Sequence, residues 1–209
     1  MKAEKLIKAS LEELVRIDSE GGEPPTSSSS RLIFPITRNK ERRVSEQEAK
    51  FLFAKQLENQ TDFYYSVETP TEETYRFSGV PEPQIDPDGL SARIDICLYK
   101  KVGSKYEREH LIEFKAHNVD VADFKKDFLK LFLEKSTGTN YFVHVIKSFN
   151  NNTIDSLKKK YKSAFKFGAK EKNRNDVKVY LCVLEPMNII YFDANERDCE
   201  TELNKLRKI

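Results

Sequence analysis

The chain has 209 residues, of which 38% are hydrophobic and 33% are charged, and this composition predicts one globular domain of ordinary size with a real hydrophobic core. No apolar run approaches the roughly 18 residues of a membrane span, and the first residues lack an apolar signal segment, so we expect a soluble, cytoplasmic protein. The three cysteines are odd in number and form no CxxC pair, which argues against a disulfide framework and a structural zinc site.

The first 30 residues predict a helix followed by a flexible linker. Residues 2–17 place apolar side chains at helical spacing, as in an amphipathic helix that packs on the edge of a domain. Residues 19–30 are rich in Gly, Pro and Ser and have no apolar group to bury. We therefore expect two parts, with residues 1–30 as a helix and its linker and residues 31–209 as one α/β domain.

The next segment leads into a second helix. Residues 31–36 form a short apolar stretch interrupted by Pro35, which suits an edge segment better than a central strand. Residues 37–43 (TRNKERR) are basic enough to contact phosphate groups, but a solvated turn explains them equally well. Ser45 and Glu48 have the spacing of a capping box, which predicts the start of a helix.

Two aromatic and β-branched runs follow, at residues 62–68 and 73–78. They predict two strands separated by a Thr/Pro turn. Residues 79–90 then form a loop rich in Pro, Gly and Asp. Asp88 lies in this loop within the sequence DPDG, where aspartate is ordinarily a turn former.

Residues 91–100 and 109–118 predict a β-hairpin. Both runs alternate side chains with a period of two, and the polar hinge between them is short enough for an antiparallel connection. A pairing centred near Ser104 puts Asp95 opposite Glu113.

This pairing predicts a metal site. The carboxylates of Asp95 and Glu113 and the ammonium of Lys115 would converge on one patch of the sheet. Repulsion between two adjacent carboxylates is costly unless a cation lies between them. The alternative is a cross-strand salt bridge on a solvated sheet face.

Asp95 followed by Glu113-Phe114-Lys115 on neighbouring predicted strands resembles the PD-(D/E)xK nuclease superfamily, which has the restriction-endonuclease-like fold. The resemblance implies that Asp95, Glu113 and the backbone carbonyl of Phe114 hold Mg²⁺, for which Mn²⁺ can substitute. It also implies that Lys115 orients or activates the attacking water. The implied activity is hydrolysis of phosphodiester bonds in nucleic acid, with DNA and endonuclease action favoured, and many relatives are homodimers.

Two details of this resemblance stay open at the level of sequence. Family members often carry an additional Glu on the helix before the catalytic strands, and both Glu46 and Glu48 fit that position as metal ligands. The proline that precedes the first aspartate in the family is replaced by Ile94. We assign the first ligand to Asp95, because a strand positions a ligand better than a loop, and keep Asp88 as the second choice.

The remaining elements alternate between helices and strands. Residues 120–134 predict an amphipathic helix from which Lys126 or Lys130 could reach a backbone phosphate. Residues 141–146 are a continuous apolar run, typical of a strand buried on both faces, and we expect His144 there to be a hydrogen-bonded core residue. The other expected elements are a helix over residues 150–167, strands over 177–184 and 189–192, and a terminal helix over 193–209.

A local basic stretch overlaps the second half of this region. Nine Lys and Arg residues stand between positions 158 and 178 against Glu171 and Asp176. Because a net charge of +2 does not by itself mark a nucleic-acid binder, this cluster is the strongest candidate for phosphate contact. A soluble helix followed by a charged loop explains it equally well. The candidate contacts are Lys158, Lys159, Lys162 and Lys166.

The order of predicted elements favours an α/β domain with a restriction-endonuclease-like core, in which a central mixed β-sheet is flanked by helices. Two functions are compatible with such a domain. The first is a Mg²⁺-dependent nuclease. The alternative is a catalytically inactive module on the same fold that binds nucleic acid or another protein.

Overall fold

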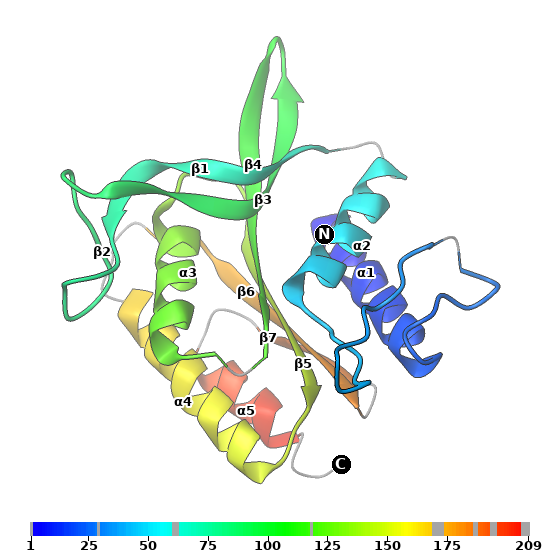
Figure 1. The fold of residues 1–209 in the computed structure, drawn as a ribbon. Helices are drawn as coiled ribbons and strands as arrows, with labels where there is room; N and C mark the ends of the chain where they lie inside the picture. The colour runs from blue at the N-terminus through cyan, green and yellow to red at the C-terminus, as the bar shows by residue number, and fades with distance from the viewer. Residues whose placement is uncertain are drawn as a thin grey trace.

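A computed structural model describes residues 2–28, 30–59, 63–117, 119–168, 174–185, 188–192 and 196–205. It shows one seven-stranded mixed sheet flanked by helices, which confirms the α/β class (Figure 1). The elements in chain order are α1 (Lys2–Ser19), α2 (Glu46–Glu58), β1 (Tyr64–Arg76), β2 (Gln84–Ile85), β3 (Leu90–Val102), β4 (Lys105–Ala116), α3 (Val121–Leu133), β5 (Asn140–Ser148), α4 (Asn151–Gly168), β6 (Val177–Glu185), β7 (Asn188–Phe192) and α5 (Glu196–Lys205).

The strands lie in the order β2-β1-β3-β4-β5-β6-β7. The three central strands β4, β5 and β6 are parallel to one another, and the other pairs are antiparallel. Parallel neighbours need a crossover connection, and α3 and α4 provide the crossovers between these three strands. The apolar run in β5 is buried on both faces, as its composition predicted.

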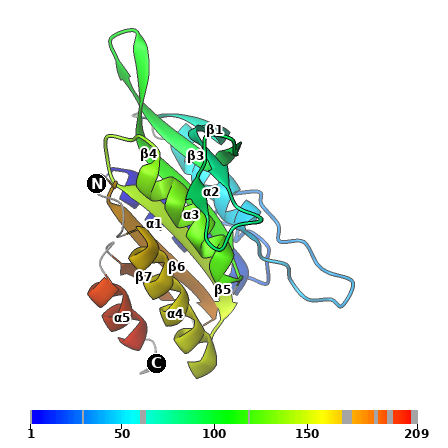
Figure 2. The same cartoon turned by 90° about the vertical axis from the view of Figure 1, so that its left-hand side faces the viewer.

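Each face of the sheet has its own hydrophobic core. The first core is formed by α1 and α2 against one face, and the second by α3, α4 and α5 against the other. Figure 2 shows α3 and α4 in front of the sheet, with α1 and α2 behind it. Leu6, Ile7, Leu11 and Leu14 of α1 are almost fully buried in the first core, so α1 is packed together with the main sheet.

The expected helices are all present within the described residues. Ser45 and Glu48 form the predicted capping box at the start of α2, and the Asn150 side chain accepts a hydrogen bond from the Thr153 backbone at the start of α4. The terminal helix runs over Glu196–Lys205, and the rest of its predicted range lies outside the described residues. Across the residues described, no helix combines the length and apolar character that crossing a membrane requires.

The segment predicted as two strands with a turn is one long strand. β1 runs from Tyr64 to Arg76, and its register against β3 shifts between Pro70 and Thr74. In this irregular stretch the Ala92 amide donates to the Thr71 hydroxyl at 2.8 Å, so a side chain replaces a backbone acceptor. The Thr/Pro signal was therefore a bulge within a strand, and the prediction of a turn there was wrong.

Glu134 at the end of α3 fixes this bulge. Its buried carboxylate accepts hydrogen bonds from the backbone amides of Glu72 at 2.8 Å and Glu73 at 3.1 Å. It also accepts from the Tyr75 hydroxyl at 2.8 Å and pairs with Arg108 at 3.2 Å. The carboxylate thus satisfies backbone groups that lack a regular partner in the sheet.

Glu134→Gln should lower the free energy of unfolding by about 2 kcal/mol. The carboxylate has two charged acceptor oxygens, whereas the amide has a single neutral one. Urea denaturation measures the change. Glu107→Gln, at an exposed position of β4, is the control and should stay within about 0.5 kcal/mol of the wild type. Equal stability of the two variants would contradict this role of Glu134.

Two further segments differ from expectation. Residues 31–36 form no strand, and Ile36 makes an isolated bridge with Arg42. The predicted hairpin is present but longer, because β3 and β4 continue to a two-residue turn at Gly103 and Ser104. Gly103 has a φ of 61°, the left-handed conformation that such turns require.

The cysteines agree with the sequence-based expectation. Cys97, Cys182 and Cys199 are buried, and no disulfide joins them. Burial raises the pKa of the Cys97 thiol and raises that of Cys182 to about 12, which makes both poor nucleophiles at neutral pH.

Candidate functional site

Asp95 lies where β3 leaves β4. The two strands pair at Ile96 and Ile112, a register centred on residue 104 as predicted, and the ladder ends there. Beyond this point, Asp95 Oδ2 accepts a hydrogen bond from the Phe114 amide at 2.7 Å. The carboxylate therefore takes the place of a backbone acceptor of the next rung.

At Asp95 the side chains of β3 also change the face of the sheet on which they lie. Ile94 is buried in the core under α3 and α4, whereas Ile96 is buried in the core under α1 and α2. In a regular strand, residues two apart face the same side. The opposing strand is distorted at the same level, because Glu68 has a φ of 48°. Beyond it, β1 and β3 form an arm that crosses over α3 (Figure 1).

Glu113 and Lys115 point from β4 toward α3. The ammonium of Lys130 lies 2.6 Å from Glu113 Oε1 and 3.0 Å from Asp127 Oδ1. Lys115 lies 2.7 Å from Asp127 Oδ2. Two residues of α3 thus form a chain of alternating charges with the two charged residues of β4.

Lys50 of α2 reaches Asp95 from the opposite side. Its ammonium lies 2.6 Å from Asp95 Oδ1, 3.5 Å from Glu68 and 3.9 Å from Glu46. Asp95 therefore stands between the two helical layers, with α2 on one side and Glu113 and its α3 partners on the other. The sequence predicted one shared face for the three residues, whereas the structure has Asp95 where β3 separates from β4, and Glu113 facing α3.

The two candidate glutamates of α2 have different surroundings. Glu48 accepts hydrogen bonds from the backbone and hydroxyl of Ser45 at 2.7 and 2.5 Å, so its carboxylate is used as a cap. Burial raises the pKa of Glu46, with further raising by Asp95 and Asp127 and lowering by Lys50 and Lys115. The structure thus puts Glu46, and not Glu48, beside the other charged groups.

We call these residues the acid–lysine cluster. It consists of Glu46, Lys50, Asp95, Glu113, Lys115, Asp127 and Lys130. Four carboxylates face three ammonium groups across elements that are distant in sequence. Glu113, Asp127 and Lys130 are buried and the other four are partly exposed. Burying charge is costly for folding, and perturbed charges are common at functional sites.

The carboxylates and lysines of the cluster perturb one another. Burial raises the pKa of Glu113 well above its ordinary value, Lys130 opposes this rise, and Asp127 and Asp95 add to it. Burial lowers the pKa of Lys115, but the charge of Asp127 and its hydrogen bond outweigh this effect, so the net pKa is raised. The pKa of Lys130 is raised in the same way by Glu113 and Asp127. These lysines are therefore cationic at neutral pH.

The donor atoms of the cluster suit a hard divalent cation in part. Asp95, Glu113 and the carbonyl of Phe114 offer only oxygen, the ligand type of Mg²⁺. Glu113 Oε1 and Asp127 Oδ2 are buried and, although each is paired with a lysine, neither accepts a well-directed hydrogen bond among the described residues. Yet no set of three acidic, His or Cys side chains there is arranged to hold a metal. An ion held by these residues would therefore have to keep several waters, because they form no closed protein cage.

Other predicted contacts lie away from the cluster or have a different role. Asp88 is exposed in the turn before β3, where its amide donates to Asp86. Lys126 pairs with Asp123 at 3.3 Å and lies over the Phe77 ring. Lys130 was predicted as a contact for a backbone phosphate. It is buried among three protein acceptors, so a phosphate would reach it only by breaking those contacts.

The predicted phosphate contacts of α4 face another helix. Lys158, Lys159 and Lys162 line a surface cavity of about 340 Å³ with Cys199 of α5. Lys166 is exposed on the same helix. The cluster instead lies between the sheet, α2 and α3. Residues 169–173 of the basic stretch lie outside the described residues.

His144 is a hydrogen-bonded core residue, as predicted. Its two ring nitrogens lie 2.7 Å from the Tyr161 hydroxyl and 2.6 Å from the His117 carbonyl. Burial lowers the pKa of His144 to about 4, so the ring is neutral at physiological pH.

Sequence reasoning missed three members of the cluster, namely Lys50, Asp127 and Lys130. A signal existed for Asp127, since it falls three residues after Phe124 and four before Leu131, on the apolar stripe of the helix. A charged residue within such a stripe indicates a buried ion pair or a site.

Comparison with known proteins adds no identity, because no protein-family model, curated protein or solved structure matches the chain. Its own fold and contacts define a protein class: an α/β protein with a mixed sheet and an acid–lysine cluster where an antiparallel arm leaves the parallel strands.

Proposed function

We propose that the protein is a metal-dependent nuclease that hydrolyses phosphodiester bonds of nucleic acid, with DNA as the favoured substrate and Mg²⁺ or Mn²⁺ as the cofactor. One observation carries the proposal. Asp95, Glu113 and Lys115, chosen from the sequence for this chemistry, meet in one place: Asp95 accepts a hydrogen bond at 2.7 Å from the Phe114 amide, which lies between the other two residues, and Lys130 and Asp127 join Glu113 to Lys115. A salt bridge on a solvated sheet face would not be buried in this way.

The arrangement of elements supports the finer fold assignment within this proposal. α2 is followed by the antiparallel strands β1, β3 and β4, and then by α3 and the parallel strand β5. The resemblance implied a helix before the two acidic strands, and α2 has this position in the chain. In such α/β sheets, functional groups gather where the strand order or direction changes, and the cluster lies at such a point.

In this proposal Asp95, Glu113 and the carbonyl of Phe114 hold the cation, with Glu46 close by. The bound cation supplies Lewis-acid polarisation of the phosphate and a lowered pKa of bound water. Lys50 and Lys130 lie 2.6 Å from Asp95 and from Glu113, so each carboxylate has a cation beside it.

Lys115 has a separate role. Its raised pKa keeps the ammonium protonated, so it orients the attacking water and offsets the negative charge that develops on the phosphate. Asp127 holds this ammonium at 2.7 Å and thereby fixes its position beside Glu113.

Asp95→Asn should reduce Mg²⁺-dependent cleavage of plasmid DNA by roughly a hundredfold or more, because a neutral amide cannot replace an anionic ligand. Asp88→Asn makes the same chemical change in an exposed turn and should cleave like the wild type. Gel analysis of cleavage rates, with thermal unfolding to verify folding, makes the comparison. An unchanged rate in Asp95→Asn would refute the proposed site.

A second function has its own supporting observation. Lys50 and Lys130 already neutralise Asp95 and Glu113, as in a module that no longer needs a metal. Such a module would bind nucleic acid with steep salt dependence but show no Mg²⁺ affinity that Glu113→Gln abolishes. Isothermal titration calorimetry with Mg²⁺ separates the two functions.

A further inference from the structure

A basic loop projects from the body between α1 and α2. We define the basic finger as residues 36–43. Thr37 and Glu41 are joined by a backbone hydrogen bond of 2.8 Å, Lys40 donates to the Thr37 carbonyl at 2.9 Å, and Arg43 donates to Pro35 at 2.8 Å. Figure 2 shows this loop extending far beyond the helices and the sheet. The loop buries little of its surface, and its own hydrogen bonds give it a defined shape.

The base of the finger is anchored. The Arg42 guanidinium donates to the Asp18 carbonyl at 2.9 Å and pairs with the Asp18 carboxylate at 3.6 Å and with Glu185 of β6 at 3.8 Å. Gly22, with a φ of 89°, allows this approach, since a Cβ there would lie 2.9 Å from Arg42 Cδ. The anchor ties the finger to α1 and to the sheet.

The finger carries cations that have no protein partner among the described residues. Arg38, Lys40 and Arg43 are exposed, and within the part of the chain that the structure describes their side chains form no hydrogen bond or ion pair. Glu41 is the finger's one acidic residue. Cations on a projecting loop attract a polyanion, and no protein carboxylate in the described ranges neutralises these three.

Arg93 of β3 is also exposed and lies two residues from Asp95, whereas the basic groups of the β3–β4 hairpin and of α4 lie elsewhere. On the β3–β4 hairpin, Lys100 pairs with Glu109, and Arg108 pairs with Glu72 and Glu134. The hairpin turn also lies at the opposite end of β4 from Glu113. The α4 lysines line the cavity beside α5. None of these hairpin and α4 groups is adjacent to the acid–lysine cluster.

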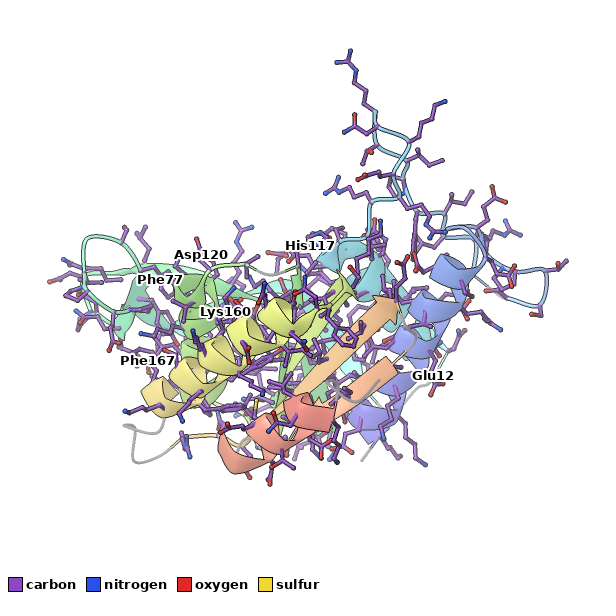
Figure 3. The ribbon with its side chains drawn as sticks, turned by 90° about the horizontal axis from the view of Figure 1, so that it is seen from below. Glu12, Phe77, His117, Asp120, Lys160 and Phe167 are labelled. Carbon is purple, nitrogen blue, oxygen red and sulfur yellow. The ribbon has the colours of Figure 1, made fainter. Side chains whose placement is uncertain are left out.

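The base of the finger is close to the cluster along the chain. Arg43 precedes Glu46 by three residues, with the buried Val44 and the helix cap Ser45 between them. Figure 3 shows the finger rising on the side of the molecule where His117 lies, two residues beyond Lys115. A strand that passes over the cluster would therefore meet the finger on its path.

We propose that the basic finger binds the phosphate backbone of the nucleic acid that enters the acid–lysine cluster. The inference rests on the proposed function for the identity of the polyanion. Arg38 and Arg43 offer forked donors to phosphate oxygens, and Lys40 adds a point charge between them. The contacts are independent of base sequence, so the finger supplies affinity and orientation and leaves sequence preference to other groups.

The test compares two triple variants that remove the same charge. Arg38→Gln, Lys40→Gln and Arg43→Gln are combined in one, and Lys159→Gln, Lys162→Gln and Lys166→Gln in the other. Binding of a fluorescent DNA duplex is followed by anisotropy over a salt series without divalent cations. The slope of log K against log salt is negative, and in the finger variant its magnitude should be smaller by about 2 to 3. Each lost phosphate contact reduces that magnitude by about 0.9. The α4 variant should keep the wild-type slope.

Each outcome decides the question. An unchanged slope in the finger variant, a loss confined to the α4 variant, or a wild type that does not bind the duplex overturns the proposal. The binding assay needs no cleavage, so its result is separate from the proposed function. If the wild type binds through the finger but never cleaves with Mg²⁺ or Mn²⁺, the nuclease proposal fails and the finger stands. Unfolding temperatures near that of the wild type verify that the exposed changes leave the fold intact.

Discussion

Lys115→Ala is expected to lower the rate of Mg²⁺-dependent cleavage by roughly 10² to 10³, the cost of removing one donor that stabilises charge in a transition state. Asp127 keeps the Lys115 ammonium protonated and fixed at 2.7 Å, so Lys115 acts as a cation and not as a base. Lys115→Arg retains the charge and should therefore lose much less activity. Single-turnover rates at saturating Mg²⁺ measure both variants.

The pH dependence gives an independent control. The pKa of Lys115 is raised above its ordinary value of 10.5 in the folded protein, so its charge persists from neutral pH to at least that value. The wild-type rate should not depend on titration of Lys115 between pH 7 and 9. If Lys115→Arg proves as inactive as Lys115→Ala, with Mg²⁺ binding intact, the assigned role of Lys115 as a cation is wrong.

Lys130→Met is expected to lower the free energy of unfolding by about 3 to 5 kcal/mol at pH 8, because it leaves a buried carboxylate without its counterion. Lys130 lies 2.6 Å from Glu113 and 3.0 Å from Asp127, and all three side chains are buried. Adding Glu113→Gln to Lys130→Met should restore a large part of the loss. Chemical denaturation of the single and double variants measures the coupling.

The destabilisation by Lys130→Met should shrink as the pH falls. Burial raises the pKa of Glu113, and loss of Lys130 raises it further. A carboxyl with a raised folded-state pKa favours the folded state below the ordinary value of 4.5 and loses that contribution as the pH rises through the folded value. The variant should therefore be closer to the wild type at pH 5 than at pH 8.

A matched substitution on the same helix controls for the loss of a lysine. Lys126 pairs with Asp123 at 3.3 Å, and their side chains are 35% and 43% exposed. Lys126→Met should change the free energy of unfolding by no more than about 1 kcal/mol. A similar loss of unfolding free energy in the Lys126 and Lys130 variants at pH 8 would contradict this prediction. It would show that leaving the buried Glu113 without its counterion costs no more than breaking an exposed ion pair.

The sequence predicted the strands of the site well because their periodicity is local. The alternation in residues 91–100 and 109–118 fixed the hairpin and its register at Ile96 and Ile112. The position of Asp95 at the end of that ladder depends on the arm that β1 and β3 form. The long strand β1 depends in turn on Glu134, which is distant in sequence. A contact between residues so far apart in the chain leaves no local pattern in the sequence.

The helical half of the cluster was harder to predict for a similar reason. Helical periodicity identifies which residues share a face, and on that basis Lys130 was predicted as a phosphate contact. Whether that face meets a buried carboxylate depends on how the helix packs on β4. The choice between Glu46 and Glu48 followed only from the geometry of the cap. Pairings between a helix and a sheet thus limit what one sequence reveals about a site.

The arm formed by β1 and β3 has a consequence for long-range communication. It joins the main sheet at Asp95, and its far part is held to the end of α3 by Glu134. A tilt of the arm would turn the backbone of residue 95 and redirect its carboxylate. A ligand or a substitution that weakens the hydrogen bonds between Glu134 and the backbone of β1 would therefore change the acid–lysine cluster without contacting it. Glu134 is thus a distant position that can regulate the site.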